Sequence, residues 1–214
     1  MAFRGAAVTL PDGGLLLCSY LLGSIPFGYL IALWRSGRDI RDLGSGNIGA
    51  TNVLRTQGKG WGLLTLILDA GKGAVPVLVG NAVSASAWVG PACGAAAVVG
   101  HCFPLWLRFR GGKGIASGLG AYLLIAPLAT ALGLALFLLV VAATGWVALG
   151  SVLASLGFGT ALILLRDRMG VPPEVVWIGC GLALLLVSRH HSNIRRLIRG
   201  AEPRVWDKGE RAES

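Results

Sequence analysis

The chain has 214 residues, of which 54% are apolar and 14% charged, and its mean hydropathy is +0.70. These values exclude an ordinary soluble domain, because such a domain carries about 25% charged residues. The net charge of +9 lies in short segments between apolar runs, which is typical of loops that set membrane topology rather than of a nucleic-acid surface. The four cysteines form no C-x-x-C pair and no metal-ligand spacing, so no metal site is predicted.

Apolar runs approach the roughly 20 residues of a membrane-spanning helix at several places. In chain order we predict spans at residues 13–34, 61–80, 87–107, 149–165 and 174–188. We therefore expect an all-α integral membrane protein, with a single polytopic membrane domain over residues 1–214 and no large soluble part. The first run is too long for a cleaved signal peptide and is interpreted as a retained span.

One further apolar block, residues 115–143, lies between the third of these spans and the last two. As a single helix it would measure about 43 Å, which is too long for a hydrocarbon core of roughly 30 Å. Pro127 lies near its middle, where a proline removes a helical hydrogen bond. The block is therefore either one kinked helix or two short helices.

The distribution of lysine and arginine favours two short helices. With seven spans, fifteen of these residues lie on one side and three (Arg4, Arg166 and Arg168) on the other. With six spans the split becomes ten to eight. Because basic loops stay in the cytoplasm, we predict about seven transmembrane helices, two of them short. Residues 1–12 would form an external N-terminal segment, and residues 198–214 a cytoplasmic basic tail.

The stretch GSGNIGATNVLR, residues 44–55, has the glycine spacing of a dinucleotide-binding loop. It follows a membrane span rather than a β-strand, so that interpretation fails. Glycines can nevertheless bring several backbone N–H groups close to an oxyanion. Short polar side chains and one guanidinium add further donors, so we predict phosphate binding by Ser45, Gly46, Asn47, Thr51, Asn52 and Arg55. A hydrated turn is the alternative.

Three other polar clusters come out on the same predicted cytoplasmic side. Gly112, Lys113 and Gly114 combine backbone donors with a cation that can bind phosphate, although no Ser or Thr follows the lysine as in a P-loop. Another inside loop, residues 144–148, brings Ser151 to this level. His190, Asn193 and Arg196 lie one helical turn apart beyond the last span and can share one face. Positive-inside anchoring and an interfacial polar cap are the alternatives.

Three ionisable residues lie inside predicted spans, where charge is expensive. Asp69 and Lys72 are three residues apart on one helix, and His101 lies in the next span. We interpret Asp69 and Lys72 as a pair that neutralises itself, and His101 as a contact between helices.

The segments GSGNIGATNVLRTQGKG, LDAGKG, GHCFPLWLRFRGGKG, LGS and RHHSNIRRL resemble the bacterial acyl-phosphate:glycerol-3-phosphate acyltransferase family, called PlsY. The resemblance covers residues 20–197. It implies a seven-helix inner-membrane enzyme without a cofactor, its active site facing the cytoplasm. Such an enzyme moves an acyl group from acyl-phosphate to glycerol 3-phosphate and so begins phospholipid synthesis. Ala148 departs from the serine of many members.

The resemblance also suggests roles for the polar clusters. As catalytic residues we predict Ser45, Lys113, His190 and Asn193. As substrate-binding residues we predict Gly46, Asn47, Thr51, Asn52, Arg55, Gly112, Gly114 and Ser151. In the family a substrate phosphate is thought to take the proton, so orientation of the substrate is the preferred role for His190 and base catalysis the second choice. The implied partners are the two substrates, membrane lipids and an enzyme that forms acyl-phosphate and hands it over.

One rival function remains open at this point, whereas a structural membrane protein with hydrated loops would explain neither the glycine-rich motifs nor their shared side. A membrane carrier of a phosphorylated solute would also need a basic site. An acyltransferase that uses thioesters commonly carries His-x-x-x-x-Asp, but here Trp106, Arg195 and Arg196 stand five residues after the three histidines. We therefore expect acyl-phosphate, not a thioester, as the donor.

Overall fold

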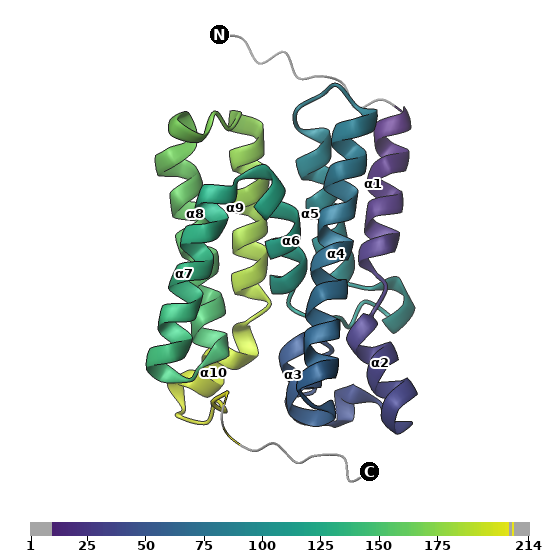
Figure 1. Ribbon diagram of the computed structural model, residues 1–214, viewed down its shortest axis with the longest axis vertical. Helices are drawn as coiled ribbons and strands as arrows, with labels where there is room; N and C mark the ends of the chain where they lie inside the picture. Colours follow the sequence, from purple (N-terminus) through teal and green to yellow (C-terminus); the bar gives the residue numbers. More distant parts are fainter. Residues whose placement is uncertain (1–9, 206, 208–214) are drawn as a thin grey trace.

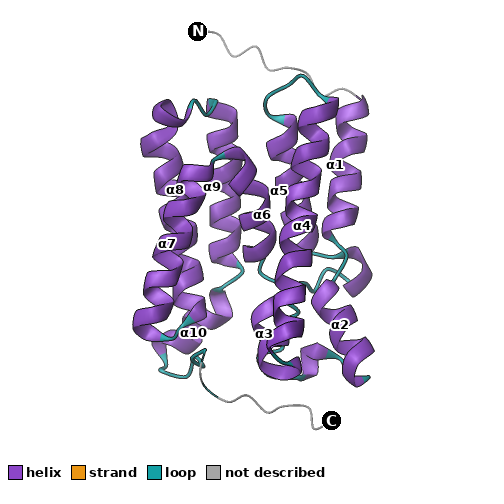
Figure 2. Ribbon diagram, in the orientation of Figure 1, coloured by secondary structure: helices purple, strands orange, loops and turns teal. Residues whose placement is uncertain are grey.

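The computed structural model describes residues 10–205 and 207, and these residues form helices and loops without a strand (Figure 2). Residues 1–9, within the predicted external segment, and Lys208 and Arg211 of the predicted tail lie outside the described residues. The α-helices are α1 Leu10–Gly23, α2 Phe27–Ser36, α3 Ala50–Gln57, α4 Lys59–Val83, α5 Val89–Cys102, α6 Ile115–Ile125, α7 Pro127–Thr144, α8 Val147–Met169, α9 Pro173–Ser188 and α10 His191–Ile198. Two 3₁₀ turns, η1 Ile40–Asp42 and η2 Leu105–Leu107, lie in the connections.

The helices have the length and composition of a membrane bundle. Among the described residues, five segments are long and apolar enough to cross a bilayer: 10–36, α4, residues 89–107, α7 and α8. A sixth would be α9 together with α10, which are bent by 51° relative to each other. Large apolar side chains such as Leu139, Leu164 and Trp177 are 67–74% exposed, which suits a surface that faces lipid. The all-α integral membrane fold is thus confirmed.

The long apolar block is divided into two helices, as the charge distribution predicted, but only α6 is short, because α7 has 18 residues and is long enough to cross a bilayer. α6 ends at Ile125, and Pro127 is the first residue of α7, where its missing N–H costs no helical hydrogen bond. The eleven residues of α6 extend only about 16 Å, roughly half of a hydrocarbon core. In Figure 1 the turn between α6 and α7 accordingly lies below the upper ends of the neighbouring helices.

The predicted first span is interrupted, which the sequence analysis did not anticipate. α1 and α2 are separated at residues 24–26, where Pro26 cannot donate to the turn before it. The carbonyl of Ile25 at this break accepts a hydrogen bond of 2.7 Å from Nζ of Lys72 in α4. The same ammonium lies 2.8 Å from the carboxylate of Asp69, so the predicted self-neutralising pair is confirmed.

The bundle has two groups of helices with α6 between them (Figure 1). α1 to α5 form one group, and α7 to α10 form the other. α6 packs closely on α4 because a glycine on each helix faces backbone of the other: a Cβ on Gly73 would overlap the carbonyl oxygen of Ser117, and one on Gly120 that of Ala70. The start of α6 and the first glycine-rich motif border the same cavity.

The described chain begins and ends at opposite ends of the bundle. α1 starts at the upper end in Figure 1, while α10 lies at the lower end together with α2 and α3. This arrangement suits an odd number of crossings. All four predicted polar clusters lie toward the lower end, because each follows a helix that descends or precedes one that rises.

Candidate active site

The first glycine-rich motif is a loop organised by one buried amide. Nδ2 of Asn52 donates to the carbonyl oxygens of Ile40 (3.3 Å), Leu43 (2.9 Å) and Asn47 (2.9 Å), and its Oδ1 accepts from the backbone N–H of Ser45 at 2.9 Å. Asn52 is 1% exposed. The amide therefore shapes the loop that carries Ser45 and Asn47, and a direct contact between Asn52 and substrate stays a prediction.

The loop also explains one of its glycines. Gly44 has φ +56°, in the left-handed region, and a Cβ there would overlap Oδ1 of Asn52. A larger residue would be strained and would also displace the amide.

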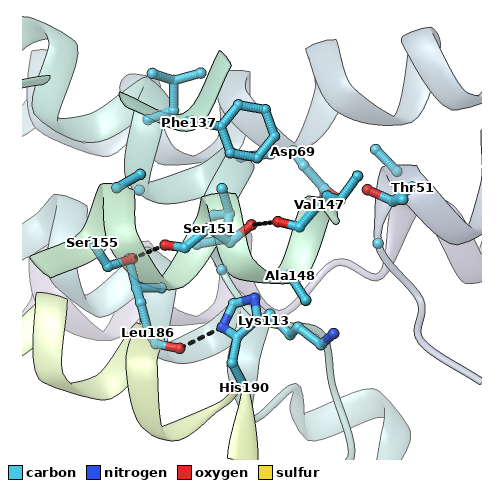
Figure 3. A pocket seen from close by; sticks show the side chains of 18 of the residues that line it. Thr51, Asp69, Lys113, Phe137, Val147, Ala148, Ser151, Ser155, Leu186 and His190 are labelled. Atoms are coloured by element: carbon cyan, nitrogen blue, oxygen red, sulfur yellow. Dashed lines mark hydrogen bonds between the residues drawn. The ribbon is translucent and has the colours of Figure 1, made fainter. Parts of the chain in front are cut away.

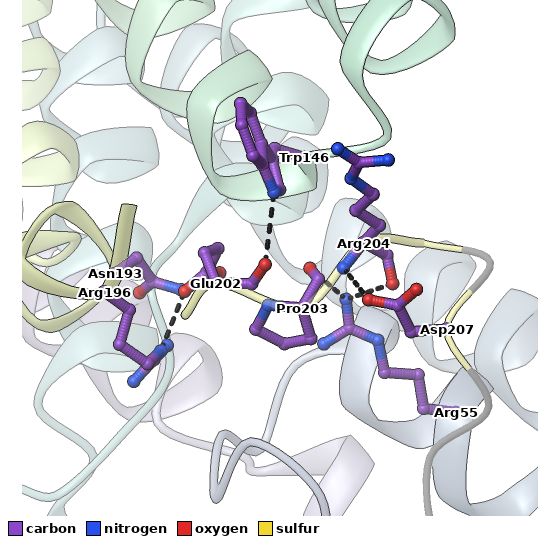
Figure 4. A network of polar contacts seen from close by, with 8 residues as sticks. All are labelled: Arg55, Trp146, Asn193, Arg196, Glu202, Pro203, Arg204 and Asp207. Carbon is purple, nitrogen blue, oxygen red and sulfur yellow. Dashed lines mark hydrogen bonds and ion pairs between the residues drawn. The ribbon is translucent and has the colours of Figure 1, made fainter. Parts of the chain in front are cut away.

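Arg55 lies near the end of α3 and points toward the C-terminal tail. One terminal nitrogen of its guanidinium donates to the carbonyl oxygens of Pro203 (3.2 Å) and Arg204 (3.4 Å) (Figure 4). Its Nε is buried and has no hydrogen-bond partner among the described residues. Burial lowers the pKa of the guanidinium, but a group with an ordinary value of 12.5 still carries its charge at neutral pH. Arg55 thus offers an unused donor beside the cavity.

The second motif forms a loop that joins η2 to α6. Nε and a terminal nitrogen of Arg189 donate to the carbonyl oxygens of Gly112 (3.2 Å) and Gly111 (3.1 Å). This contact leaves Lys113, the next residue, on the wall of the cavity. Burial lowers the pKa of its ammonium to about 8, with the nearby cations adding to the effect and Glu202 opposing it. A phosphate placed there would restore the charge of the lysine.

His190 is held in one orientation at the junction of α9 and α10. Its Nδ1 lies 2.7 Å from the carbonyl oxygen of Leu186 (Figure 3). A carbonyl oxygen can only accept, so Nδ1 carries the proton in the neutral ring. Nε2 is then the acceptor, and as His190 lines the cavity this nitrogen is available to a substrate hydroxyl or phosphate.

The hydroxyl groups near the start of α8 are directed along their own helix. Oγ of Ser151 donates to the carbonyl oxygen of Val147 at 2.8 Å, and Oγ of Ser155 donates to that of Ser151 at 2.8 Å (Figure 3). A hydroxyl that donates in this way keeps its acceptor capacity. Ser151 can therefore accept from a substrate hydroxyl without breaking its present bond.

The tail folds back across the site and inserts a carboxylate. Oε1 of Glu202 accepts from Nδ2 of Asn193 at 2.6 Å, and Oε2 accepts from Nε of Arg196 at 2.8 Å (Figure 4). The backbone of the tail is fixed as well: the indole of Trp146 donates to the carbonyl oxygen of Glu202 at 3.1 Å, and Val205 N–H donates to that of Gly145 at 2.7 Å. Residues 200–205 thus form an ordered strap rather than a free basic tail.

These groups meet in one cavity of about 380 Å³, which has a polar end and an apolar shaft. Ser45, Thr51, Arg55, Lys113 and His190 line the polar end. The shaft runs between α6, α7, α8 and α9, and its lining includes Leu134, Phe137, Leu138, Phe158 and Leu182. Figure 3 shows Lys113 and His190 close together, with Phe137 farther along the cavity. The arrangement suits a ligand with an anionic head and an acyl chain.

The structure brings most of the predicted site residues together. The cavity is lined by Ser45, Asn47, Thr51, Asn52, Arg55, Lys113, Gly114, Ser151, His190 and Asn193. Gly46 and Gly112 do not line it. Gly46 instead borders a second, polar cavity together with Arg41, Arg110 and Arg189. Whether the lining residues act as predicted in binding and catalysis stays a prediction.

Three residues with acidic or imidazole side chains at the cavity were not predicted as part of the site. Glu202 lies in a segment that the sequence marks only as basic, and its contact with Asn193 depends on the path of the tail. Asp69 and His101 were assigned to structure alone, yet both line the cavity. Their ionisable character within a span was the available signal.

Comparison with known proteins identifies the family. A model described as glycerol-3-phosphate acyltransferase matches residues 14–200. The chain belongs to this family. A glycerol-3-phosphate acyltransferase of Synechococcus sp. (strain CC9902) is 44% identical over 91% of this chain and 96% of its own length. One of Anaeromyxobacter dehalogenans (strain 2CP-1) is 45% identical over 91% and 99%.

Solved structures agree with this assignment. The crystal structure of PlsY (YgiH), an integral membrane glycerol 3-phosphate acyltransferase, in its glycerol 3-phosphate form has a TM-score of 0.84 and 36% identity, covering 91% of this chain and 95% of that one. The lysophosphatidic acid form has a TM-score of 0.80 and 34% identity over the same shares. The chain is thus a membrane glycerol-3-phosphate acyltransferase, an enzyme of phospholipid biosynthesis, and the carrier alternative is not favoured.

Proposed function

We propose that the acyl donor is acyl-phosphate and that the products are lysophosphatidic acid and inorganic phosphate. The observation that carries this proposal is the single cavity in which an apolar shaft leads to Arg55, Lys113 and His190. An acyl chain would lie in the shaft, and its phosphoryl head would reach the polar end. Glycerol 3-phosphate brings a second phosphate to the same end, which accounts for the excess of cations and backbone donors there.

In the proposed reaction, the free primary hydroxyl oxygen of glycerol 3-phosphate attacks the acyl carbonyl carbon. The new ester C–O bond forms, and the bond between that carbon and the phosphate oxygen breaks. The hydroxyl proton passes to a substrate phosphate or to Nε2 of His190, and phosphate leaves with its electron pair. Arg55 and Lys113 would stabilise the departing charge, while Ser45 and Asn193 would donate to the oxyanion. Positioning of both substrates would supply much of the remaining rate.

We further propose that the enzyme lies in the bacterial inner membrane with this site facing the cytoplasm, where an acyl-phosphate-forming enzyme could hand over its product. The fifteen-to-three division of basic residues supports this orientation. Reporter fusions after Trp34 and Arg110 should report the cytoplasm, and a fusion at Asp167 the opposite side. A cytoplasmic signal at Asp167 would contradict the orientation.

The donor can be tested with purified protein in detergent or lipid. Acyl-phosphate, acyl-CoA and acyl carrier protein thioesters are each supplied with glycerol 3-phosphate, and lysophosphatidic acid is measured. We expect turnover with acyl-phosphate and none with the thioesters, because the cavity offers phosphate ligands at its polar end. Transfer from a thioester at a comparable rate would overturn the proposal.

A further inference from the structure

Asp69, Lys72 and His101 form a buried polar cluster in the bundle, and only part of it is explained by the fold. Their residues are 1%, 3% and 4% exposed. Lys72 has a structural task, because it binds the Ile25 carbonyl at the break between α1 and α2 and is neutralised by Asp69. His101 takes no part in that task. Because a buried ionisable side chain is costly inside a membrane bundle, we expect His101 to have a separate function.

The ring of His101 is set between Asp69 and the second glycine-rich motif. Its Nδ1 lies 3.5 Å from Oδ1 of Asp69. Its opposite edge faces Gly112, because a Cβ on that glycine would overlap Nε2 of the imidazole. The backbone of the two residues is joined as well, since Gly112 N–H donates to the carbonyl oxygen of His101 at 3.0 Å. His101 therefore supports the loop through both its ring and its main chain.

The same loop is held from its other side by Arg189, which donates to the carbonyl oxygens of Gly111 and Gly112. Gly112 is thus clamped between α5 and the end of α9. Lys113 follows directly and enters the cavity, whose lining also includes Asp69 and His101. The position of Gly112 therefore sets the direction in which the side chain of Lys113 enters the cavity.

We propose that Asp69 and His101 are positioning residues for the acyltransfer reaction: the carboxylate orients the imidazole, and the imidazole supports Gly112 so that Lys113 meets the substrate phosphate. This inference rests on the proposed role of Lys113. His101 is not assigned as a base, because Nε2 is in contact with the loop. The position of Lys113 relative to the substrate phosphate affects the rate, since a displacement of about 1 Å at a catalytic group can cost about a hundredfold.

Two substitutions of His101 distinguish the contact at Nδ1 from the contact at Nε2. His101→Gln places an amide near the position of Nε2 and keeps the contact with Gly112, whereas His101→Asn keeps a donor near Nδ1 and loses that contact. We expect His101→Asn to lower kcat/KM about tenfold or more, and His101→Gln to lower it less, because the support of Gly112 remains and only the contact with Asp69 is lost. A purely structural need for a polar partner of Asp69 would give the reverse order and would overturn the proposal.

A double-mutant cycle with Lys113→Ala tests whether His101 acts through the lysine. Lys113→Ala alone should lower kcat/KM strongly, and adding His101→Asn should then change it less than twofold. The same fold loss in both backgrounds would overturn the inference and leave the role of Lys113 intact. Wild-type activity of Lys113→Ala would overturn both the inference and the proposed role.

A second variant keeps the test valid if His101→Asn folds poorly. Gly112→Ala removes no buried polar group, yet its Cβ would push the loop away from the imidazole. It should show the same coupling to Lys113→Ala, and independent effects would contradict the proposal. Thr65→Val is the matched control, because Thr65 is fully buried one turn before Asp69 and its hydroxyl donates along its own helix, to the carbonyl oxygen of Trp61. Its activity should be unchanged.

Discussion

The first glycine-rich motif and the His190–Arg196 segment line the same cavity but are ordered in different ways. In the first, the amide of Asn52 binds groups that lie five to twelve residues away along the chain. In the second, Asn193 and Arg196 are held by Glu202 of a tail that is itself fixed to Gly145, Trp146 and Arg55. One region is ordered locally, and the other depends on three separated parts of the chain. A substitution should therefore disturb only neighbouring residues in the first region, but several separated segments of the chain in the second.

The largest effect is expected where the two regions meet, at Arg55. This side chain extends from the first motif to the tail, and its charge is part of the proposed phosphate site. Arg55→Ala should raise the barrier for kcat/KM by about 2–4 kcal/mol, the range for loss of one preorganised electrostatic donor. Steady-state kinetics with acyl-phosphate provides the measurement. Wild-type kcat/KM in a correctly folded variant would remove Arg55 from the site.

Substitution of Asn52 should break the local order of the first motif. In Asn52→Asp the carboxylate can still accept from Ser45 N–H but can no longer donate to the three carbonyl oxygens. We expect a loss of about 1–3 kcal/mol in stability, with increased hydrogen exchange confined to residues 40–52. Exchange that spreads equally to α10 would contradict the local character of the motif. Asn47→Asp in the same loop is a suitable comparison.

Glu202→Gln tests the long-range order of the second region. The amide can still accept from Asn193, but the charge that pairs with Arg196 is lost. We expect a stability loss of about 1 kcal/mol, because Arg196 is partly exposed and the pair is screened by solvent. Hydrogen exchange should rise in α10 and around Gly145 and Trp146 together. A change limited to the tail itself would show that the strap does not order its neighbours.

The pH dependence of activity should give the smallest and most specific effect. Burial lowers the pKa of Lys113 to about 8, so its charge is present below that pH and is lost as the pH rises through it. Because kcat/KM reports groups of the free enzyme, it should decline above about pH 8. Lys113→Arg retains its charge and should remove this decline, even if its activity is lower throughout. An unchanged alkaline limb in Lys113→Arg would assign the decline to another group.

The two regions also show how far sequence reasoning extends in this protein. Apolar length and Pro127 left one kinked helix or two open, and the distribution of lysine and arginine along the chain then favoured the separate helices α6 and α7, because that distribution can be read from the sequence alone. The break between α1 and α2 was missed, since the ammonium that binds the free carbonyl of Ile25 comes from 47 residues away. In the same way most of the residues that the motifs marked do line the cavity, whereas the contact of Glu202 with Asn193 follows from the path of the tail.

The strap has a practical consequence for work with this enzyme. Its carboxylate and backbone contacts lie within residues 202–205, close to the C-terminal end of the chain. A truncation placed before Glu202 would leave the amide of Asn193 and the guanidinium of Arg196 without their shared carboxylate. Affinity tags and fluorescent reporters joined to this end should therefore follow the complete tail through a flexible spacer, and activity measured with shortened versions would underestimate that of the intact enzyme.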